Sequence, residues 1–270
     1  MPVAALRFGN KGVLVVSSGV TPGFSLLCAP GSRPGAAEVE RLLQAPAPRD
    51  AQLARDAQLV RISHRPAEAE GWLELLASGL TFDLAGLAPA APAPRPAVAH
   101  RFNVPEALAN QALEAVSLVP GDHVSAAGGQ VAVVRMMAGI AARLAKLPGV
   151  RAVCWHPLAS WMEAGYFARI VSAWLAGGVF PALGLTTFQS AGKGQLLTLG
   201  MACFTGQELR VEVGPGERRS ETTKLAVRAV DLLVRHGPVH ERMTLVGPVG
   251  EPLMVEPEPG GKVLRLWRDA

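Results

Sequence analysis

The chain has 270 residues, of which 49% are hydrophobic and 18% charged, and its formal net charge is +4. This composition is typical of a globular protein with a sizeable core and argues against intrinsic disorder. The charges are dispersed, without the clustered Lys and Arg that contact phosphate backbones, so we expect no nucleic-acid partner. Three widely spaced cysteines do not make a disulfide framework, which favours a reducing cytoplasm.

The first 97 residues predict an αβ unit that is followed by a proline-rich linker. Its expected elements are strands at 12–18, 58–63 and 80–84, a short helix at 36–43, and an apolar turn of helix or a strand at 71–78. The segment GLAPAAPAPRPA at 86–97 holds four prolines within eight residues, a composition that favours extended polyproline II. We therefore expect an αβ unit at 1–85, a linker at 86–97 and a second domain at 98–270.

The second domain shows clearer periodicity. Its expected helices are 105–116, 130–147, 163–175 and 221–236, and its expected strands are 123–127, 150–156, 181–188, 196–204, 207–213, 244–246, 253–256 and 263–267. The helix at 130–147 has an apolar stripe at helical spacing, formed by Val133, Met137, Ile140 and Leu144. Strand pairs joined by tight turns and mixed with helices predict an α+β fold, with helices layered on a mainly antiparallel sheet.

Half of the aromatic residues, seven of fourteen, lie between 150 and 188. Large aromatic side chains dominate both cores and interfaces, so the segment marks either the centre of the fold or a contact surface. As a contact surface, its candidate binding residues are Trp155, Trp161, Tyr166 and Trp174.

An uncharged run of 23 residues, from Ile170 to Gly192, is long enough to cross a bilayer. The Gly177-Gly178 pair and Pro181 interrupt it, however. A buried helix, turn and strand explain the run, so we expect no membrane span.

Residues that could carry chemistry are few and scattered. His156 ends a predicted strand beside two tryptophans, which makes it the weak candidate for a catalytic residue, with Cys154 nearby as a possible thiolate partner. Alternation along the strand equally places Cys154 in the core. The glycine pairs in AAGGQV (126–131) and SAGKG (190–194) fit tight turns better than phosphate cradles. No Cys or His spacing fits zinc, so we expect no metal and no cofactor.

Candidate carboxylates are Glu163, Glu208 and Glu212. Each of the three occupies a position that a solvated strand or a helix start would also give it.

The segments AVCWH, EAGYF, FPALGLTTF, TLGMACFTGQELRVEV, TKLAVRAVDLLVRHG and MTLVGPVGEPLMVEP carry a resemblance to a known family. Over about residues 100–270, and most strongly after 150, the chain resembles the bacterial domain of unknown function 4261. The resemblance implies an α+β domain and a bacterial source. It brings no activity and no catalytic residues.

Two functions from different classes fit these observations. The first is a non-catalytic, cytoplasmic interaction or accessory protein that binds another protein through aromatic anchors. The alternative is a hydrolase or a small-molecule-binding enzyme with a pocket near His156. Self-association is also possible, through a sheet edge or through the charged face of the 221–236 helix.

Overall fold

The computed structural model describes residues 21–45, 60–192, 195–212, 214 and 218–268, and the predicted strand at 12–18 lies outside them. The described chain forms two compact units, residues 21–179 and residues 180–268. Each unit contains its own mainly antiparallel sheet with helices, which confirms the predicted α+β class. None of the helices in the described ranges combines the length and the apolar character that a bilayer crossing requires.

The unit formed by residues 21–179 is built on an eight-stranded sheet with the order β2-β3-β4-β6-β1-β7-β8-β5. Its strands are β1 (Phe24–Cys28), β2 (Arg61–His64), β3 (Trp72–Ala77), β4 (Leu80–Ala85), β5 (His100–Phe102), β6 (Glu114–Pro120), β7 (Val150–Trp155) and β8 (Ser160–Glu163). All neighbouring strands are antiparallel except β5 and β8.

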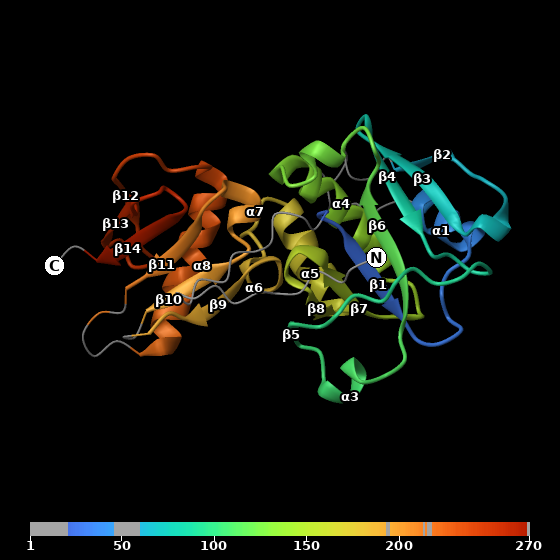
Figure 1. The fold of residues 1–270 in the computed structure, drawn as a ribbon, viewed down its shortest axis with the longest axis horizontal. Coiled ribbons are helices and arrows are strands. Elements are labelled where there is room, and N and C mark those ends of the chain that lie inside the picture. Colours follow the sequence, from blue (N-terminus) through green and yellow to red (C-terminus); the bar gives the residue numbers. More distant parts are fainter. Residues whose placement is uncertain (1–20, 46–59, 193–194, 213, 215–217, 269–270) are drawn as a thin grey trace. The chain divides into compact units, whose positions relative to one another are not determined.

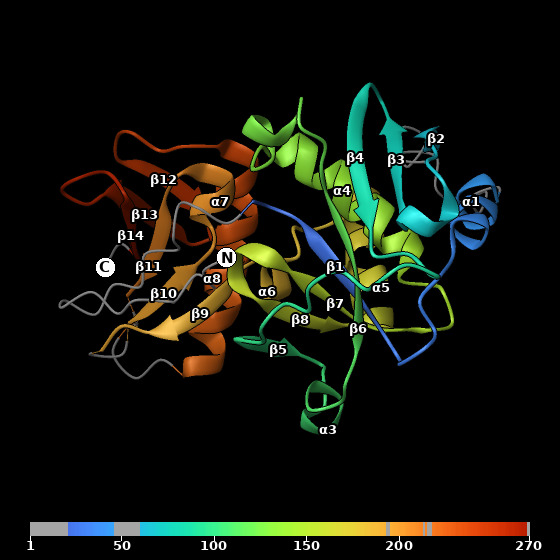
Figure 2. The ribbon, with the colours of Figure 1, turned by 45° about the vertical axis from the view of Figure 1, so that its right-hand side comes forward.

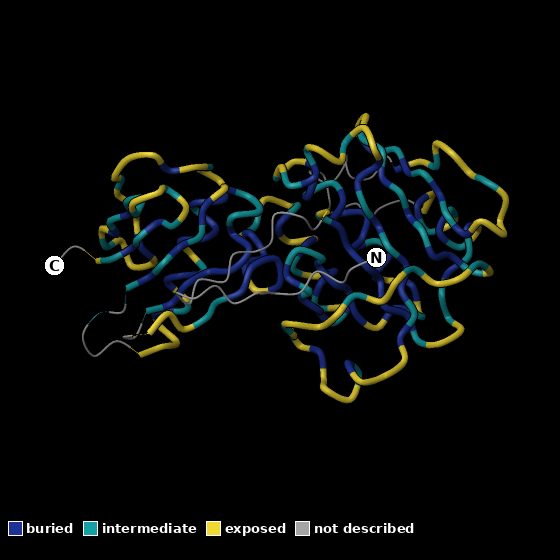
Figure 3. Tube along the Cα trace, in the orientation of Figure 1, coloured by how far each residue is buried: buried dark blue, intermediate teal, exposed yellow. Residues whose placement is uncertain are grey.

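Strand β1 lies inside this sheet, between β6 and β7, and all five of its residues are buried. The sequence prediction missed it. A strand that is covered on both faces loses the alternation of polar and apolar residues by which strands are recognised. Figure 3 shows burial concentrated along the strands and the helix faces that meet them, with exposed residues in the connecting loops.

One face of the sheet is covered by three helices, α1 (Ala36–Gln44), α4 (Val131–Leu144) and α5 (Ala164–Leu175). Helix α4 packs against β1 and β6, and α5 packs against β7 and α4, as Figure 1 shows. The predicted stripe of α4 is buried at all four positions. This confirms that its 3.6-residue periodicity marked the core face.

The proline-rich segment 86–97 and the residues after it lie against the opposite face of the sheet. A buried apolar cluster there joins the strands to this segment; its members are Leu27, Val104, Ala109, Leu113, Ala115, Ala152, Cys154 and Trp161, with Ala93 and Leu108 packed on them. The chain therefore divides after residue 179, and not at 86–97 as we expected.

Hydrogen bonds fasten the proline-rich segment to the sheet. Its alanine N–H groups donate to main-chain oxygens, as Ala88 does to Pro34 and Ala93 to Ala115. The largely buried guanidinium of Arg33 donates to the carbonyls of Gly86 (2.6 Å) and Ala90 (2.8 Å). Proline removes donors but leaves carbonyls, so such a segment can still be held as an acceptor.

Two predicted elements of this unit are wrong. The helix expected at 105–116 is a single turn, α3 (Glu106–Ala109), and the chain then enters β6, where pairing with β1 and β4 overrides helix propensity. The strand expected at 123–127 is instead a 3₁₀ turn, Ser125–Ala127.

The unit formed by residues 180–268 has a six-stranded sheet with the order β12-β13-β14-β11-β10-β9. Its elements are α6 (Ala182–Leu185), β9 (Thr187–Ser190), β10 (Leu196–Leu199), α7 (Ala202–Thr205), β11 (Glu208–Val211), α8 (Arg219–His236), β12 (Met243–Val246), β13 (Pro252–Pro257) and β14 (Val263–Arg268). Helix α8 packs against β10 and β11, and Figure 2 shows it behind these strands. The strands expected at 181–188 and 196–204 are shorter, because α6 and α7 occupy part of each range.

Asp231 anchors α8 to the start of this unit. Its side chain is almost fully buried and accepts a hydrogen bond from the main-chain N–H of Phe180 at 2.8 Å. Arg228 and Arg235, one turn away on either side, donate to its two carboxylate oxygens. Asp231 therefore belongs to the interior, although the sequence places it on the charged face of the 221–236 helix.

Replacement of Arg33 tests whether the proline-rich segment is part of the core structure. We expect Arg33→Ala to lower the free energy of unfolding by about 2 kcal/mol, because it leaves two carbonyls without a donor and Glu114 without its cation. Arg65→Ala is the matched control, since its ion pair with Glu40 is exposed and contributes about 0.5 kcal/mol. Denaturant unfolding measures both variants, and equal effects would contradict the assignment.

Candidate functional site

His156 lies where β7 ends and a 3₁₀ turn (His156–Leu158) begins. Its main-chain N–H donates to the carbonyl of Gly23, and its ring lies against the same glycine. A Cβ atom at position 23 would stand 2.6 Å from Nδ1, closer than atoms can approach, so only glycine fits there.

The imidazole forms one side-chain hydrogen bond, between Nε2 and the Oγ of Ser25 at 2.8 Å. Burial lowers the pKa of His156 to about 4, because removal from water disfavours the charged ring. His156 is therefore neutral near pH 7. Sequence reasoning missed Ser25, although a lone serine in the apolar strand FSLLC is a signal for a buried polar pair.

A serine–histidine pair is a component of hydrolase sites, but its surroundings here favour a structural role. Ser25 is only 2% exposed, so its Oγ offers little access to a substrate. No carboxylate among the described residues hydrogen-bonds to His156, so the third group that orients the base of a triad is missing from that part of the chain. A histidine with a pKa near 4 is also a weak general base.

The four aromatic candidates do not form one surface. Trp155 shares a face of the sheet with Phe24, at 4.8 Å between ring centroids, and lies on the side of helix α5. Trp161 belongs to the cluster on the other face, where its Nε1–H donates to the carbonyl of Ala97 at 3.0 Å. Both indoles are fully buried.

Trp174 and Tyr166 lie on α5 and differ in burial. Trp174 is buried, and the guanidinium of Arg135 lies 4.8 Å from its ring centroid. Tyr166 is half-buried, with Arg169 at 5.4 Å, and burial raises the pKa of its hydroxyl. The three tryptophans lie in the core and offer no aromatic anchor to a partner, so Tyr166 alone of the four candidates is partly exposed.

The cysteine thiols are unsuited to nucleophilic chemistry. Burial raises the pKa of Cys28 and of Cys203 to about 11, and raises that of Cys154 above its usual range. The thiolate is the reactive form, so these three thiols are inert near pH 7. Cys154 packs beside Trp161 in the cluster, as the alternation of its strand indicated.

The three candidate carboxylates hold backbone or cationic groups. Glu163 is the N-cap of α5 and accepts from the N–H groups of Gly165 and Tyr166. Glu208 accepts from the hydroxyl of Thr198 and from the N–H groups of residues 200, 201 and 202. Burial nevertheless raises the pKa of Glu208, and Glu212 pairs with Arg265.

The glycine pair in AAGGQV forms the turn before α4, and a Cβ atom on Gly128 would come within 3.1 Å of Pro120. Residues 193 and 194 of SAGKG lie outside the described residues. Over the described ranges, no group of three or more His, Cys, Asp or Glu side chains is placed to hold a metal ion.

The buried histidine predicts a specific dependence of stability on pH. In the unfolded chain the histidine pKa is near 6.5, and in the folded protein it is about 4, so protonation favours unfolding. The stabilisation is complete above pH 6.5, falls as the pH drops to about 4, and stays lost below it. The loss is on the order of 3 kcal/mol.

His156→Gln is the variant that tests this dependence, because glutamine keeps a polar partner for Ser25 but does not titrate. Between pH 7 and pH 4 the wild type should lose more unfolding free energy than the variant, as measured by denaturant unfolding at each pH. Parallel pH profiles for the two proteins would show that His156 is not the titrating group.

Comparison of the chain with protein-family models, with curated proteins and with solved structures finds no match. The resemblance to the domain of unknown function 4261 therefore stays a prediction.

Proposed function

We propose that the protein is a non-catalytic interaction protein of the bacterial cytoplasm, and that it binds a partner protein through the β12–β13 hairpin. The observation that carries the proposal is the exposure of two valines on this hairpin. Val246 is 66% exposed and Val249 is 88% exposed. Apolar side chains that gather on one surface element are typical of an interaction site.

The hairpin presents these valines on a fixed scaffold. Gly247 donates its main-chain N–H to the carbonyl of Glu251, and Val249 donates to the Glu251 carboxylate at 2.9 Å. Strand β12 is the last strand in the sheet order, so in the described part of the chain its outer edge pairs with no other strand. An open edge can accept an extended segment of a partner by main-chain hydrogen bonds.

Polar residues occupy the other end of β12 and β13, away from the apolar tip. Arg242 forms a two-pronged contact with Glu256, and Arg265 bridges Glu256 and Glu212. The guanidinium groups of Arg242 and Arg265 lie 5.4 Å and 4.8 Å from the ring centroid of Trp267. These charged groups are already paired with one another, so the apolar contact that we propose is confined to the tip.

The hairpin differs from the surface that we expected from the sequence. The tryptophans of 150–188 pack in the core. We therefore propose the hairpin valines, and not the aromatic rings, as the residues that contact a partner. The resemblance to the domain of unknown function 4261 implies no activity, so it neither supports nor opposes this proposal.

A hydrolase that uses Ser25 and His156 is the second candidate, and the 2.8 Å contact between their side chains is the observation in its favour. Since Ser25 is buried and His156 is a weak base, we expect no reaction of Ser25 with a fluorophosphonate probe of serine hydrolases. Mass spectrometry of the treated protein, with the Ser25→Ala variant as the blank, would reveal a labelled Ser25 and so establish the hydrolase instead.

The docking proposal is tested by a variant with Val246→Lys and Val249→Lys. Two lysines at these exposed sites leave the core intact but make the tip unfavourable for apolar contact. Affinity capture from an extract of the producing cells should recover a partner with the wild type and lose it, by about tenfold or more, with the hairpin variant.

Val98→Lys is the matched control, because Val98 is also exposed but belongs to the other unit. It should capture the same partner as the wild type. Sedimentation velocity of the three proteins identifies a second copy as the partner if concentration-dependent association disappears only in the hairpin variant. Capture that is unaffected by the two lysines would reject the hairpin as the docking site.

A further inference from the structure

A pocket of about 390 Å³ lies in the unit formed by residues 180–268, at the opposite end of β12 and β13 from the hairpin tip. Three connections line it: the turn after α7, the link between α8 and β12, and the turn between β13 and β14. Its lining residues are Thr205, Gly206, Gln207, Pro238, Val239, His240, Pro257, Glu258, Gly261 and Lys262.

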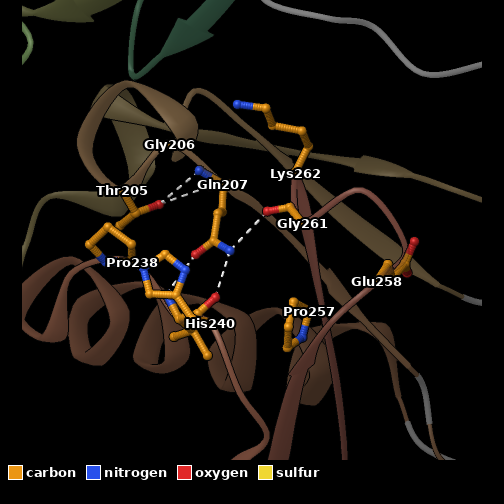
Figure 4. Close-up of a pocket in the computed structure, with 10 residues that line it drawn as sticks. Thr205, Gly206, Gln207, Pro238, His240, Pro257, Glu258, Gly261 and Lys262 are labelled. Atoms are coloured by element: carbon orange, nitrogen blue, oxygen red, sulfur yellow. Dashed lines mark hydrogen bonds between the residues drawn. The ribbon is translucent and has the colours of Figure 1, made fainter.

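Gln207 fixes the geometry of this pocket. Its amide nitrogen donates to the carbonyls of Val239 (2.8 Å) and Gly261 (2.9 Å), and its amide oxygen accepts from the N–H of Val239 (2.8 Å). One buried side chain therefore holds the other two connections in place, as Figure 4 shows. A pocket that is formed before its ligand arrives does not lose binding energy to ordering its own loops.

The electrostatics of the pocket favour an anion. Glu258 contributes no free negative charge, because its carboxylate is paired with Arg210 at 2.6 Å and turns away from Gln207 in Figure 4. Lys262 forms neither an ion pair nor a side-chain hydrogen bond with any residue in the described ranges, and the same is true of His240. Their side chains lie on either side of Gln207.

Size and lining define the class of ligand. A volume near 390 Å³ is in the range of small-molecule sites. Pro238 and Pro257 supply rigid apolar walls, while Lys262 offers a charged donor and His240 an imidazole. We propose that this pocket binds a small organic anion, with its carboxylate or phosphate group at Lys262 and its apolar part against the proline lining.

The experiment titrates the full-length protein with succinate and, separately, with inorganic phosphate, at constant ionic strength and with amide shifts recorded by NMR. We expect saturable binding of at least one probe in the millimolar range, with the shifts centred on Val239 and Gly261. Lys262→Gln should weaken binding by about tenfold, since it removes one charge-assisted hydrogen bond. Tighter binding of succinate would identify a carboxylate ligand, and tighter binding of inorganic phosphate would identify a phosphate ligand.

Lys224→Gln is the matched control, because Lys224 is exposed on α8 of the same unit. It should bind as the wild type does. Both lysines are on the surface, so the two variants should unfold at the same denaturant midpoint as the wild type. Equal midpoints would show that weaker binding by Lys262→Gln is not caused by misfolding. Absence of saturable binding by both probes, shifts that are centred elsewhere, or an equal loss in the two variants would overturn the proposal.

Discussion

The unit formed by residues 21–179 depends on the complete burial of strand β1. Its backbone pairs with β6 on one side and β7 on the other, and its side chains meet helices on one face and the proline-rich segment on the opposite face. A strand in that position has no route to water for any polar group. The hydroxyl of Ser25 must therefore find a partner inside the protein, and the Nε2 atom of His156 is that partner. The Ser25–His156 pair, which most resembles a catalytic pair, is therefore a consequence of the burial of strand β1 on both faces.

The same physical rule explains three other buried or largely buried polar side chains. Asp231, Gln207 and Glu208 each hold main-chain N–H or carbonyl groups of connecting segments. Buried backbone groups need such partners, because a group left unpaired costs more than a typical hydrogen bond contributes. Carboxylates and amides that are used in this way fix the connecting segments in place. The surface features for which we propose a function are the hairpin with Val246 and Val249 and the pocket with Lys262.

Prediction from the sequence succeeded where one segment carries its own signal. The apolar stripes of α4 and α5 are local patterns, and helices form within both predicted ranges, 130–147 and 163–175. Prediction failed where pairing with distant residues decides the outcome. Residues 105–116 contain good helix formers, yet the chain extends at Glu114 because β1 and β4 supply partners for a strand. The candidate site was foreseen only in part, because His156 stands out in the sequence and Ser25, 131 positions away, does not.

The sequence by itself determined the α+β class, the long helices and the closing strands, since helical and strand periodicity are properties of short segments. It also marked 150–188 as important for its aromatic residues. Only the tertiary structure decided that Trp155 and Trp161 lie on opposite faces of one sheet and that both are buried. It also decided that the proline-rich segment covers that sheet. The physical reason is that burial and register come from contacts between residues far apart in the chain, and no single segment encodes them.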